Sequence, residues 1–321
     1  MENFKENVTL GRRAFLRNGV LLLAASTLDF GDDGPRFANE VMFAKSALRV
    51  GLMTDLHYAD KAELGTRFYR ETPGKLAEAA AQFRANRPDF LVALGDLIDA
   101  ADSIEAELAY VKTIHTQLTA VAKHRHYVLG NHCVSSLTKR EFLDSVDQQQ
   151  SYYSFDKGDY HFIVLDACFR VDGEAYGRRN FEWTDTSIPT IELDWLRTDL
   201  MRTRRSCVVF AHQRLDVNTE HGVKNAPQVR NILESSGKVL AVFQGHSHQN
   251  ALTDIGGIHY CTLRAMVEGS GEASNAFAML EILPRNALRL SGFRMQSSYY
   301  WSPEESSGVP ASSERPIGHS A

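Results

Sequence analysis

The sequence lacks the features of a membrane-spanning, disulfide-stabilised or nucleic-acid-binding protein. No apolar run reaches the ~18 residues that a transmembrane helix needs, so no permanent membrane span is expected. Lys and Arg number 35 against 40 Asp and Glu, a net charge of −5, whereas a binder of a nucleic-acid polymer usually has a basic face. The few cysteines form no C-x-x-C pair, and we interpret each as a buried apolar side chain rather than a redox or zinc-binding residue. They are Cys133, Cys168, Cys207 and Cys261.

The remaining composition is typical of a globular protein. Of the 321 residues, 43% are hydrophobic and 10% are aromatic, which is enough to bury a full core. This composition excludes collagen and an intrinsically disordered chain. At roughly 150 residues per domain, the length allows one large domain or two modest ones.

The N-terminal segment has the pattern of an export signal. Arg12-Arg13 is followed by Phe15-Leu16 and by the largely apolar stretch from Gly19 to Leu28. A basic segment before a short apolar run is typical of a signal peptide, and the arginine pair resembles the twin-arginine signal of bacteria. We therefore expect residues 1–45 to be a signal peptide and linker read by the twin-arginine translocon, with a periplasmic or extracellular destination. The alternative is an amphipathic first helix with two surface arginines.

Short apolar runs alternate with helix-like stretches from residue 47 onward. Strands are expected over 48–53, 90–94, 126–129, 152–155, 160–165, 207–211, 239–244, 258–263, 276–282 and 287–295. Helices are expected over 74–85, 103–121, 188–201 and 227–233, the second with Asp102 as N-cap and Glu105 completing a capping box. This order predicts an α/β domain over 46–300 that ends in antiparallel strands, followed by a Ser/Glu/Pro-rich tail, 301–321, expected to be disordered.

Polar side chains follow five of the expected buried strands, where each strand ends. They are Asp55 and His57, Asp96 and Asp99, Asn131 and His132, His212, and His246 and His248. In an open α/β sheet, ligands bind in the crevice at the carboxyl ends of the strands, so we expect these residues to form one cluster. A glycine directly precedes Asp96, Asn131 and His246, which predicts sharp turns that aim these side chains into the crevice.

Asp, Asn and imidazole ligands suit borderline metals such as Mn, Fe and Zn. Seven such residues are too many for one ion and fit two ions that share a bridging carboxylate. Only Asp55 and Asp96 among these ligands carry charge, so two divalent cations would leave the site positive and attractive to a phosphoryl group.

The order of these motifs resembles that of the calcineurin-like metallophosphoesterase family: D-x-H, G-D-x-x-D, G-N-H-[DE], a lone His, then G-H-x-H. The resemblance spans residues 50–250. It implies a four-layer αββα sandwich of two mixed β-sheets flanked by helices.

The resemblance also implies a role for each residue. Asp55, His57 and His248 would hold one metal, Asn131, His212 and His246 the other, and Asp96 would bridge them. His132 would be the general acid, with Asp99 orienting it and raising its pKa, while a metal-activated hydroxide attacks phosphorus in line. The family's acidic residue after G-N-H is Cys133 here, which puts the local hydrogen bonding in doubt.

A finer resemblance concerns the substrate. The stretches 55–60 and 67–70, with 257–260, 267–269 and 276–277, are similar to the manganese-dependent ADP-ribose/CDP-alcohol diphosphatases, although that subgroup commonly has Gln in place of His57. This similarity implies a small phosphate ester or nucleotide diphosphate as substrate. Arg67 and Arg70 would bind a second phosphate, and Tyr58 or Tyr69 would stack on a base or sugar. The alternative is a solvated basic turn with two packing tyrosines.

Two other classes of function compete. Gly245-His246-Ser247-His248-Gln249 superficially matches the nucleophile elbow of a serine esterase, but its fifth residue is Gln rather than Gly. The second is a non-catalytic, exported metal- or phosphate-binding module. Degenerate members usually lose a ligand or the acid, and the presence of Asp96, Asn131 and His132 favours an enzyme.

Overall fold

The computed structural model describes residues 14–17, 20–23, 28–29, 36–37 and 48–302. The chain divides into two compact units, residues 1–47 and 48–321. In the first unit β1 (Ala14–Arg17) pairs antiparallel with β2 (Val20–Leu23), and β3 (Leu28–Asp29) pairs with β4 (Arg36–Phe37). The described residues therefore do not form the amphipathic helix of the alternative interpretation. The arginine pair at 12–13 lies outside the described residues.

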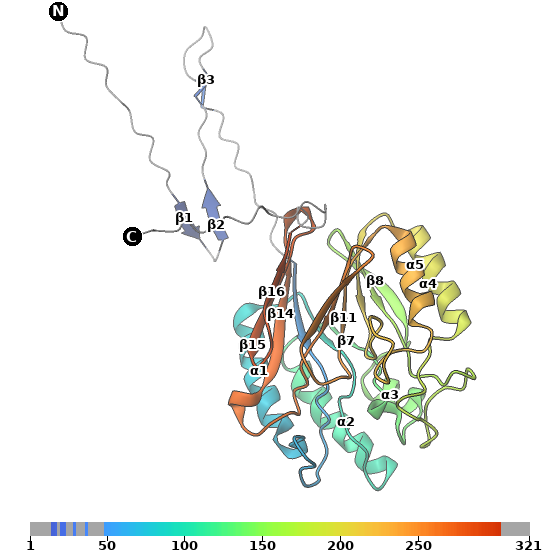
Figure 1. Ribbon diagram of the computed structural model, residues 1–321. Helices are drawn as coiled ribbons and strands as arrows, with labels where there is room; N and C mark the ends of the chain where they lie inside the picture. The colour runs from blue at the N-terminus through green and yellow to red at the C-terminus, as the bar shows by residue number, and fades with distance from the viewer. Residues whose placement is uncertain (1–13, 18–19, 24–27, 30–35, 38–47, 303–321) are drawn as a thin grey trace, which may run out of the picture. The chain divides into compact units, whose positions relative to one another are not determined.

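The second unit contains two six-stranded mixed sheets. Sheet I has the order β16 (Tyr299–Trp301), β15 (Leu288–Arg294), β14 (Ala276–Ile282), β5 (Leu48–Met53), β6 (Phe90–Ala93) and β7 (Arg125–Tyr127). Sheet II has the order β12 (Ala251–Ile255), β13 (Ile258–Thr262), β11 (Val239–Gln244), β10 (Ser206–Phe210), β9 (Tyr160–Val164) and β8 (Tyr153–Lys157). Helices α1 and α2 lie outside one sheet and α4 and α5 outside the other (Figure 1). The predicted four-layer αββα sandwich is confirmed.

The layers follow from the two-residue repeat of the strands. Val50 and Leu52 of β5 point between the sheets and pack in one cluster with Phe162, Phe210 and Phe243 of sheet II. The next residue, Met53, points to the other face, where it packs with the helices. Since alternate residues of a strand face opposite sides, a run of apolar residues buries both faces of each sheet.

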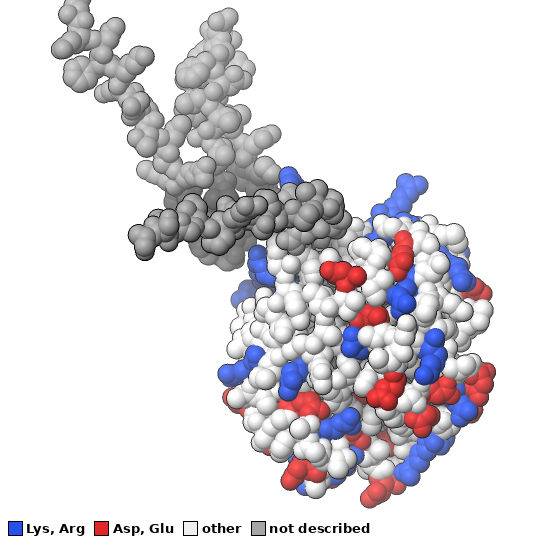
Figure 2. Space-filling model, in the orientation of Figure 1, with Lys and Arg blue, Asp and Glu red and all other residues white. Residues whose placement is uncertain are grey.

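Five helices cover the outer faces: α1 (Thr72–Asn86), α2 (Ile104–Thr119), α3 (Lys139–Ser145), α4 (Thr190–Arg202) and α5 (Ala226–Ser236). The expected N-cap Asp102 is wrong. Ser103 caps α2 and accepts a hydrogen bond from the amide of Ala106 (3.2 Å), because the extended backbone at Ser103 aims its hydroxyl at that amide. On the face of the molecule shown in Figure 2, basic and acidic side chains are interspersed.

Among the α-helices and strands of the second unit, α3 (Lys139–Ser145), β12 and β16 were not expected from the sequence. α3 begins with a capping box in which Thr138 and Glu141 bond each other's backbone. Trp301, the first residue of the expected tail, belongs to β16 and packs in the core between the sheets. Among the described residues, no helix is both long and apolar enough to cross a bilayer.

Strand direction positions the site. β5, β6 and β7 run parallel in sheet I, and β9, β10 and β11 run parallel in sheet II. Their carboxyl ends therefore deliver loop residues from both sheets to one place.

Candidate active site

The structure brings the polar residues at the five strand ends together. Three groups of side chains present ligand atoms within 4.8 Å of one another. The groups are Asp55 with His57 and His248, His57 with Asp96 and His132, and Asp96 with His212 and His246. The predicted clustering of these strand-end residues is confirmed.

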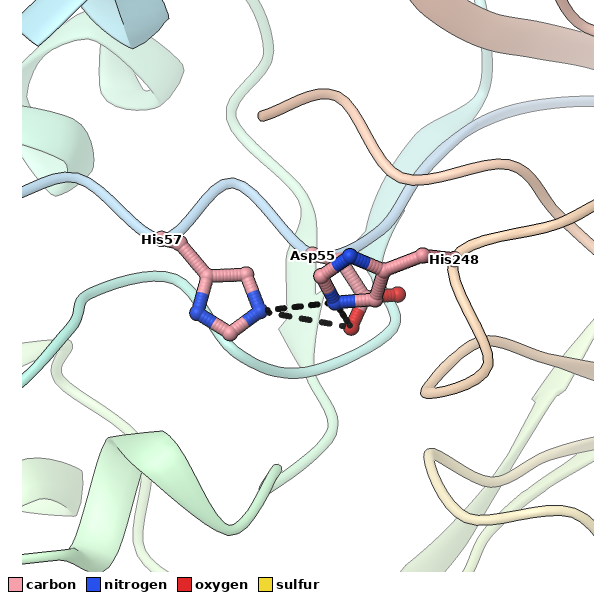
Figure 3. A group of neighbouring side chains, drawn as sticks. All are labelled: Asp55, His57 and His248. Carbon is pink, nitrogen blue, oxygen red and sulfur yellow. Dashed lines mark hydrogen bonds and ion pairs between the residues drawn. The ribbon is translucent and has the colours of Figure 1, made fainter. Parts of the chain in front are cut away.

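The first group combines two loops of different sheets. Asp55, His57 and His248 point toward one another (Figure 3). Oδ1 of Asp55 lies 3.6 Å from Nε2 of His57 and 3.4 Å from Nε2 of His248, and the two Nε2 atoms are 3.1 Å apart. Three ligand atoms thus converge on one point.

Asp96 lies between His57 of the first group and His212 of the third. Its Oδ2 atom is 3.5 Å from Nε2 of His57 and 3.1 Å from Nε2 of His212. One carboxylate therefore faces an imidazole of each group, which is the position that a bridging ligand requires.

The backbone at these residues is held in an uncommon conformation. The residues with a positive φ include Asp55 (50°), His57 (45°), Asp96 (47°), His246 (70°) and His248 (60°). A non-glycine residue with positive φ costs about 1–3 kcal/mol and tends to occur at functional sites. The fold therefore retains strain at five of the seven predicted metal ligands.

The glycines before Asp96, Asn131 and His246 are explained mainly by lack of space. Only Gly95 has a positive φ, 95°. A Cβ at Gly130 would lie 2.2 Å from Oδ1 of Asp96, and one at Gly245 would lie 2.0 Å from Oγ1 of Thr54. Of the three glycines, only Gly95 therefore adopts the conformation that favours glycine. At Gly130 and Gly245 the missing side chain lets two loops approach closely.

Three of the histidines are oriented through Nδ1. His57 donates to Asp99 (3.0 Å), His212 to the carbonyl of Leu94 (2.7 Å), and His248 to Glu268 (2.6 Å). A hydrogen bond at Nδ1 fixes the tautomer and leaves the Nε2 lone pair free for a metal.

Among the described residues, four buried atoms of the predicted metal ligands have no hydrogen-bond partner. They are Oδ1 of Asp55, Oδ1 of Asn131, Nε2 of His212 and Nε2 of His246. An unsatisfied buried polar atom costs about 1–3 kcal/mol, and four in one cluster are explained if they bind cations. The residues present therefore fit a dinuclear metal site.

The electrostatics of the cluster favour added positive charge. Burial raises the pKa of Asp55, but His212 and His248 lower it by more, so the carboxyl is ionised. Burial lowers the pKa values of His212 and His248, yet the carboxylates raise both to about 9. Burial and nearby His212 lower the pKa of His246 to about 3, so this imidazole is neutral.

His132 lies beside the cluster and is connected to it through the backbone. Its amide donates to Oδ1 of Asp96 (2.8 Å), and its Nδ1 lies 3.4 Å from Oδ1 of Asp99. Burial lowers the pKa of His132, but Asp96 and Asp99 raise it above its usual value. Asp99 also accepts a hydrogen bond from Lys61 (2.8 Å), so it holds His57 and Lys61 in addition to its contact with His132.

Cys133 takes a structural part. Its sulfur accepts a hydrogen bond from the amide of Leu97 (3.4 Å), and burial raises the pKa of the thiol to about 12. The neutral thiol thus supports the turn after β6, at the position where the family pattern has an acidic residue.

A pocket of about 230 Å³ opens over the cluster. Its lining residues are His57, Arg67, Asp96, Asn131, His132, Trp183, His221, His246 and His248. Of the four expected substrate residues, only Arg67 lines this pocket.

The other three expected substrate residues, Arg70, Tyr69 and Tyr58, do not line this pocket. Arg70 donates to Asp60 (2.6 Å), and both side chains are exposed. Tyr69 is 2% exposed and packs in an apolar cluster under Lys61, so the expectation that it stacks on a substrate ring is wrong. Tyr58 packs against Tyr110 with ring centroids 5.3 Å apart.

Four residues near the cluster were not assigned a role from the sequence: Lys61, Trp183, His221 and Glu268. Glu268 stands in the stretch 267–269 that carries the finer resemblance, which is the only signal that could have found it. The two pocket residues lie in loops where no local pattern marks them.

Ser247 does not have the geometry of a catalytic nucleophile. Its hydroxyl has no hydrogen-bond partner within residues 48–302, so no base is bonded to it. The segment leads from β11 into β12, whereas a nucleophile elbow leads from a strand into a helix.

Comparisons with known proteins agree with this geometry. The sequence matches the family described as calcineurin-like phosphoesterase over residues 48–250. It is 22% identical over 303 residues to a manganese-dependent ADP-ribose/CDP-alcohol diphosphatase of Xenopus laevis, covering 72% of this chain and 84% of that protein. It is 24% identical over 219 residues to a probable cyclic nucleotide phosphodiesterase of Pseudoalteromonas, covering 67% and 76%. The crystal structure of a dimetal phosphatase from Danio rerio superposes with a TM-score of 0.70 at 21% identity, covering 80% of this chain and 99% of that one.

Proposed function

The chain belongs to the calcineurin-like phosphoesterase family, and from this premise we propose that it hydrolyses the pyrophosphate bond of a small nucleotide-type substrate. The observation that carries the proposal is the position of Arg67. It lines the same pocket as the metal-ligand cluster and His132, with Nη1 4.0 Å from Oδ2 of Asp99. A guanidinium beside a phosphoryl-binding cluster suits a substrate with a second phosphate.

We propose that the seven ligands hold two divalent ions. Asp55, His57 and His248 would bind one, Asn131, His212 and His246 the other, with Asp96 between them. Two cations held there would supply Lewis acidity toward a phosphoryl oxygen. Carboxylate and imidazole ligands admit Mn, Fe or Zn, and we favour manganese because the relatives in Xenopus are named manganese-dependent.

His132 is suited to protonate the leaving oxygen. It lines the pocket, its Asp96 and Asp99 neighbours raise its pKa, and Asp96 fixes its backbone. A positioned general acid contributes about 10²–10⁴-fold to the rate of such a reaction. A binding module without activity would not need this arrangement.

The proposal is tested by phosphorus NMR of ADP-ribose incubated with the purified protein and manganese. Appearance of AMP and ribose phosphate would support pyrophosphate cleavage. An unchanged spectrum, together with hydrolysis of a simple aryl phosphate ester, would reject this substrate class and retain the two-metal phosphoesterase. A sample containing a chelator serves as the control.

We also propose export through the twin-arginine translocon, on the basis of the sequence at residues 11–28. Replacing Arg12 and Arg13 by Lys should leave the precursor in the cytoplasm, and Arg17→Lys should not. Equal export of all three proteins would overturn the proposal.

A further inference from the structure

One wall of the pocket is aromatic and has no part in the roles described above. The ring of Trp183 lies 5.3 Å from that of His221, centroid to centroid, and 5.9 Å from that of His246. His221 in turn lies 5.6 Å from His246. Trp183 and His221, which we call the aromatic wall, thus stand beside the group that contains His212 and His246.

The loops that carry the aromatic wall are anchored. Tyr176 donates its hydroxyl to the carbonyls of Glu182 (3.1 Å) and Asp185 (2.5 Å), on either side of Trp183. Two backbone hydrogen bonds close the loop of His221. The amide of Arg214 donates to the carbonyl of His221 (3.2 Å), and the amide of Val223 donates to the carbonyl of Arg214 (2.9 Å). Rings held by anchored loops lose little freedom when they bind a ligand.

The cationic side of the pocket lies next to the other group of ligands. Arg67 forms a β-bridge with Glu268, the partner of His248, and approaches Asp99, the partner of His57. The proposed acid His132 also contacts Asp99. The pocket therefore has a charged end, with Arg67 and the acid, and an aromatic end.

The size of the pocket limits what it encloses. At about 230 Å³ it is smaller than the roughly 300–1,000 Å³ of sites that enclose a whole drug-sized ligand. It suits the reacting phosphate and the groups attached to it, with larger parts of the substrate at its edge. Trp183 and His221 are both half-buried, so each has a face available there.

We propose that the aromatic wall is a subsite for a planar ring attached to the phosphate that is attacked, while Arg67 binds the phosphate that leaves. The proposal rests on the proposed function. Hydrolysis forms a bond from the water oxygen to the phosphorus on the aromatic side and breaks the bond from that phosphorus to the bridging oxygen. The bridging oxygen leaves with the second phosphate and takes a proton from His132. A proton released by the attacking water then returns His132 to its protonated form.

Binding measurements test the subsite without requiring turnover. With the manganese-loaded protein, calorimetry should show that Trp183→Ala weakens AMP binding about tenfold and leaves methyl phosphate binding unchanged, since only AMP has a base that can stack on the ring. Trp183→Phe should restore most of the affinity. The matched control is Trp195→Ala, a tryptophan on α4 that packs against Tyr152 and does not line the pocket. Equal affinity of wild type and Trp183→Ala for AMP would overturn the subsite, whatever the fate of the proposed reaction.

Labelled water tests the direction of attack. ADP-ribose hydrolysed in ¹⁸O-water should give AMP that carries the label and ribose phosphate that does not. Label in the ribose phosphate would overturn the assignment of the two ends of the pocket, and it would leave pyrophosphate hydrolysis itself established.

Discussion

His248 donates a hydrogen bond from Nδ1 to Oε1 of Glu268 at 2.6 Å, and this contact joins the loop after β11 to the loop after β13. Hydrogen bonding to His248 lowers the pKa of Glu268 to about 2, so the carboxyl is ionised at neutral pH. The pair has the carboxylate–histidine arrangement that raises the basicity of a metal-binding imidazole.

Glu268→Gln should weaken metal binding about 10–100-fold, because the amide cannot support the imidazole as a carboxylate does. Calorimetric titration of the metal-free protein with manganese measures this change. Glu272→Gln, at an exposed side chain, is the matched control and should bind as the wild type does. An unchanged affinity in Glu268→Gln would show that this contact has no role in holding metal.

Asp96→Asn should lose at least one of two metal ions, because its Oδ2 atom faces histidines of both groups. Elemental analysis of the purified protein gives the number of ions per chain. Asp144→Asn, an exposed carboxylate paired with Arg140, should keep both ions. Full occupancy in Asp96→Asn would argue against the bridge.

His132→Ala should keep its metal and lower turnover about 10²–10⁴-fold for substrates with a poor leaving group. The loss should be smaller for an aryl ester, because its leaving group needs less protonation. His124→Ala changes an exposed histidine and should behave as the wild type. Retention of full turnover by His132→Ala would remove the assignment of the acid.

A histidine far from the cluster should make stability depend on pH. His161 bonds Asp199 through Nε2 and Asp156 through Nδ1, each at 2.7 Å. The hydrogen bond that His161 donates to Asp199 raises the pKa of His161, while burial lowers it. The folded pKa exceeds the unfolded value, so the stabilisation is fully present below about pH 6.5 and is lost as pH rises through the folded pKa.

His161→Gln should therefore lower the free energy of unfolding by about 2 kcal/mol at pH 5.5 and by less at pH 9. Urea unfolding with a chelator present measures both values without the contribution of bound metal. His124→Gln, at an exposed histidine, is the matched control. An equal loss of stability for His161→Gln at both pH values would mean that folding does not raise the pKa of His161.

Much of the fold was readable from the sequence because its elements are encoded locally. The apolar runs of β5, β11 and β14 gave the bounds found in the structure, 48–53, 239–244 and 276–282. The strand expected over 126–129 is displaced from β7, and β16 was not expected at all. Strands of three residues owe their pairing to neighbouring strands rather than to their own sequence pattern.

The sequence by itself determined that polar residues follow five buried strands. Because parallel strands end at a common edge of the sheet, these residues had to meet there. Only the tertiary structure decided what surrounds them. It placed Glu268 on His248 and Lys61 on Asp99, buried Tyr69, and brought Trp183 and His221 to the pocket. These contacts join loops far apart in the sequence, and loop position depends on packing and long-range hydrogen bonds that no local periodicity records.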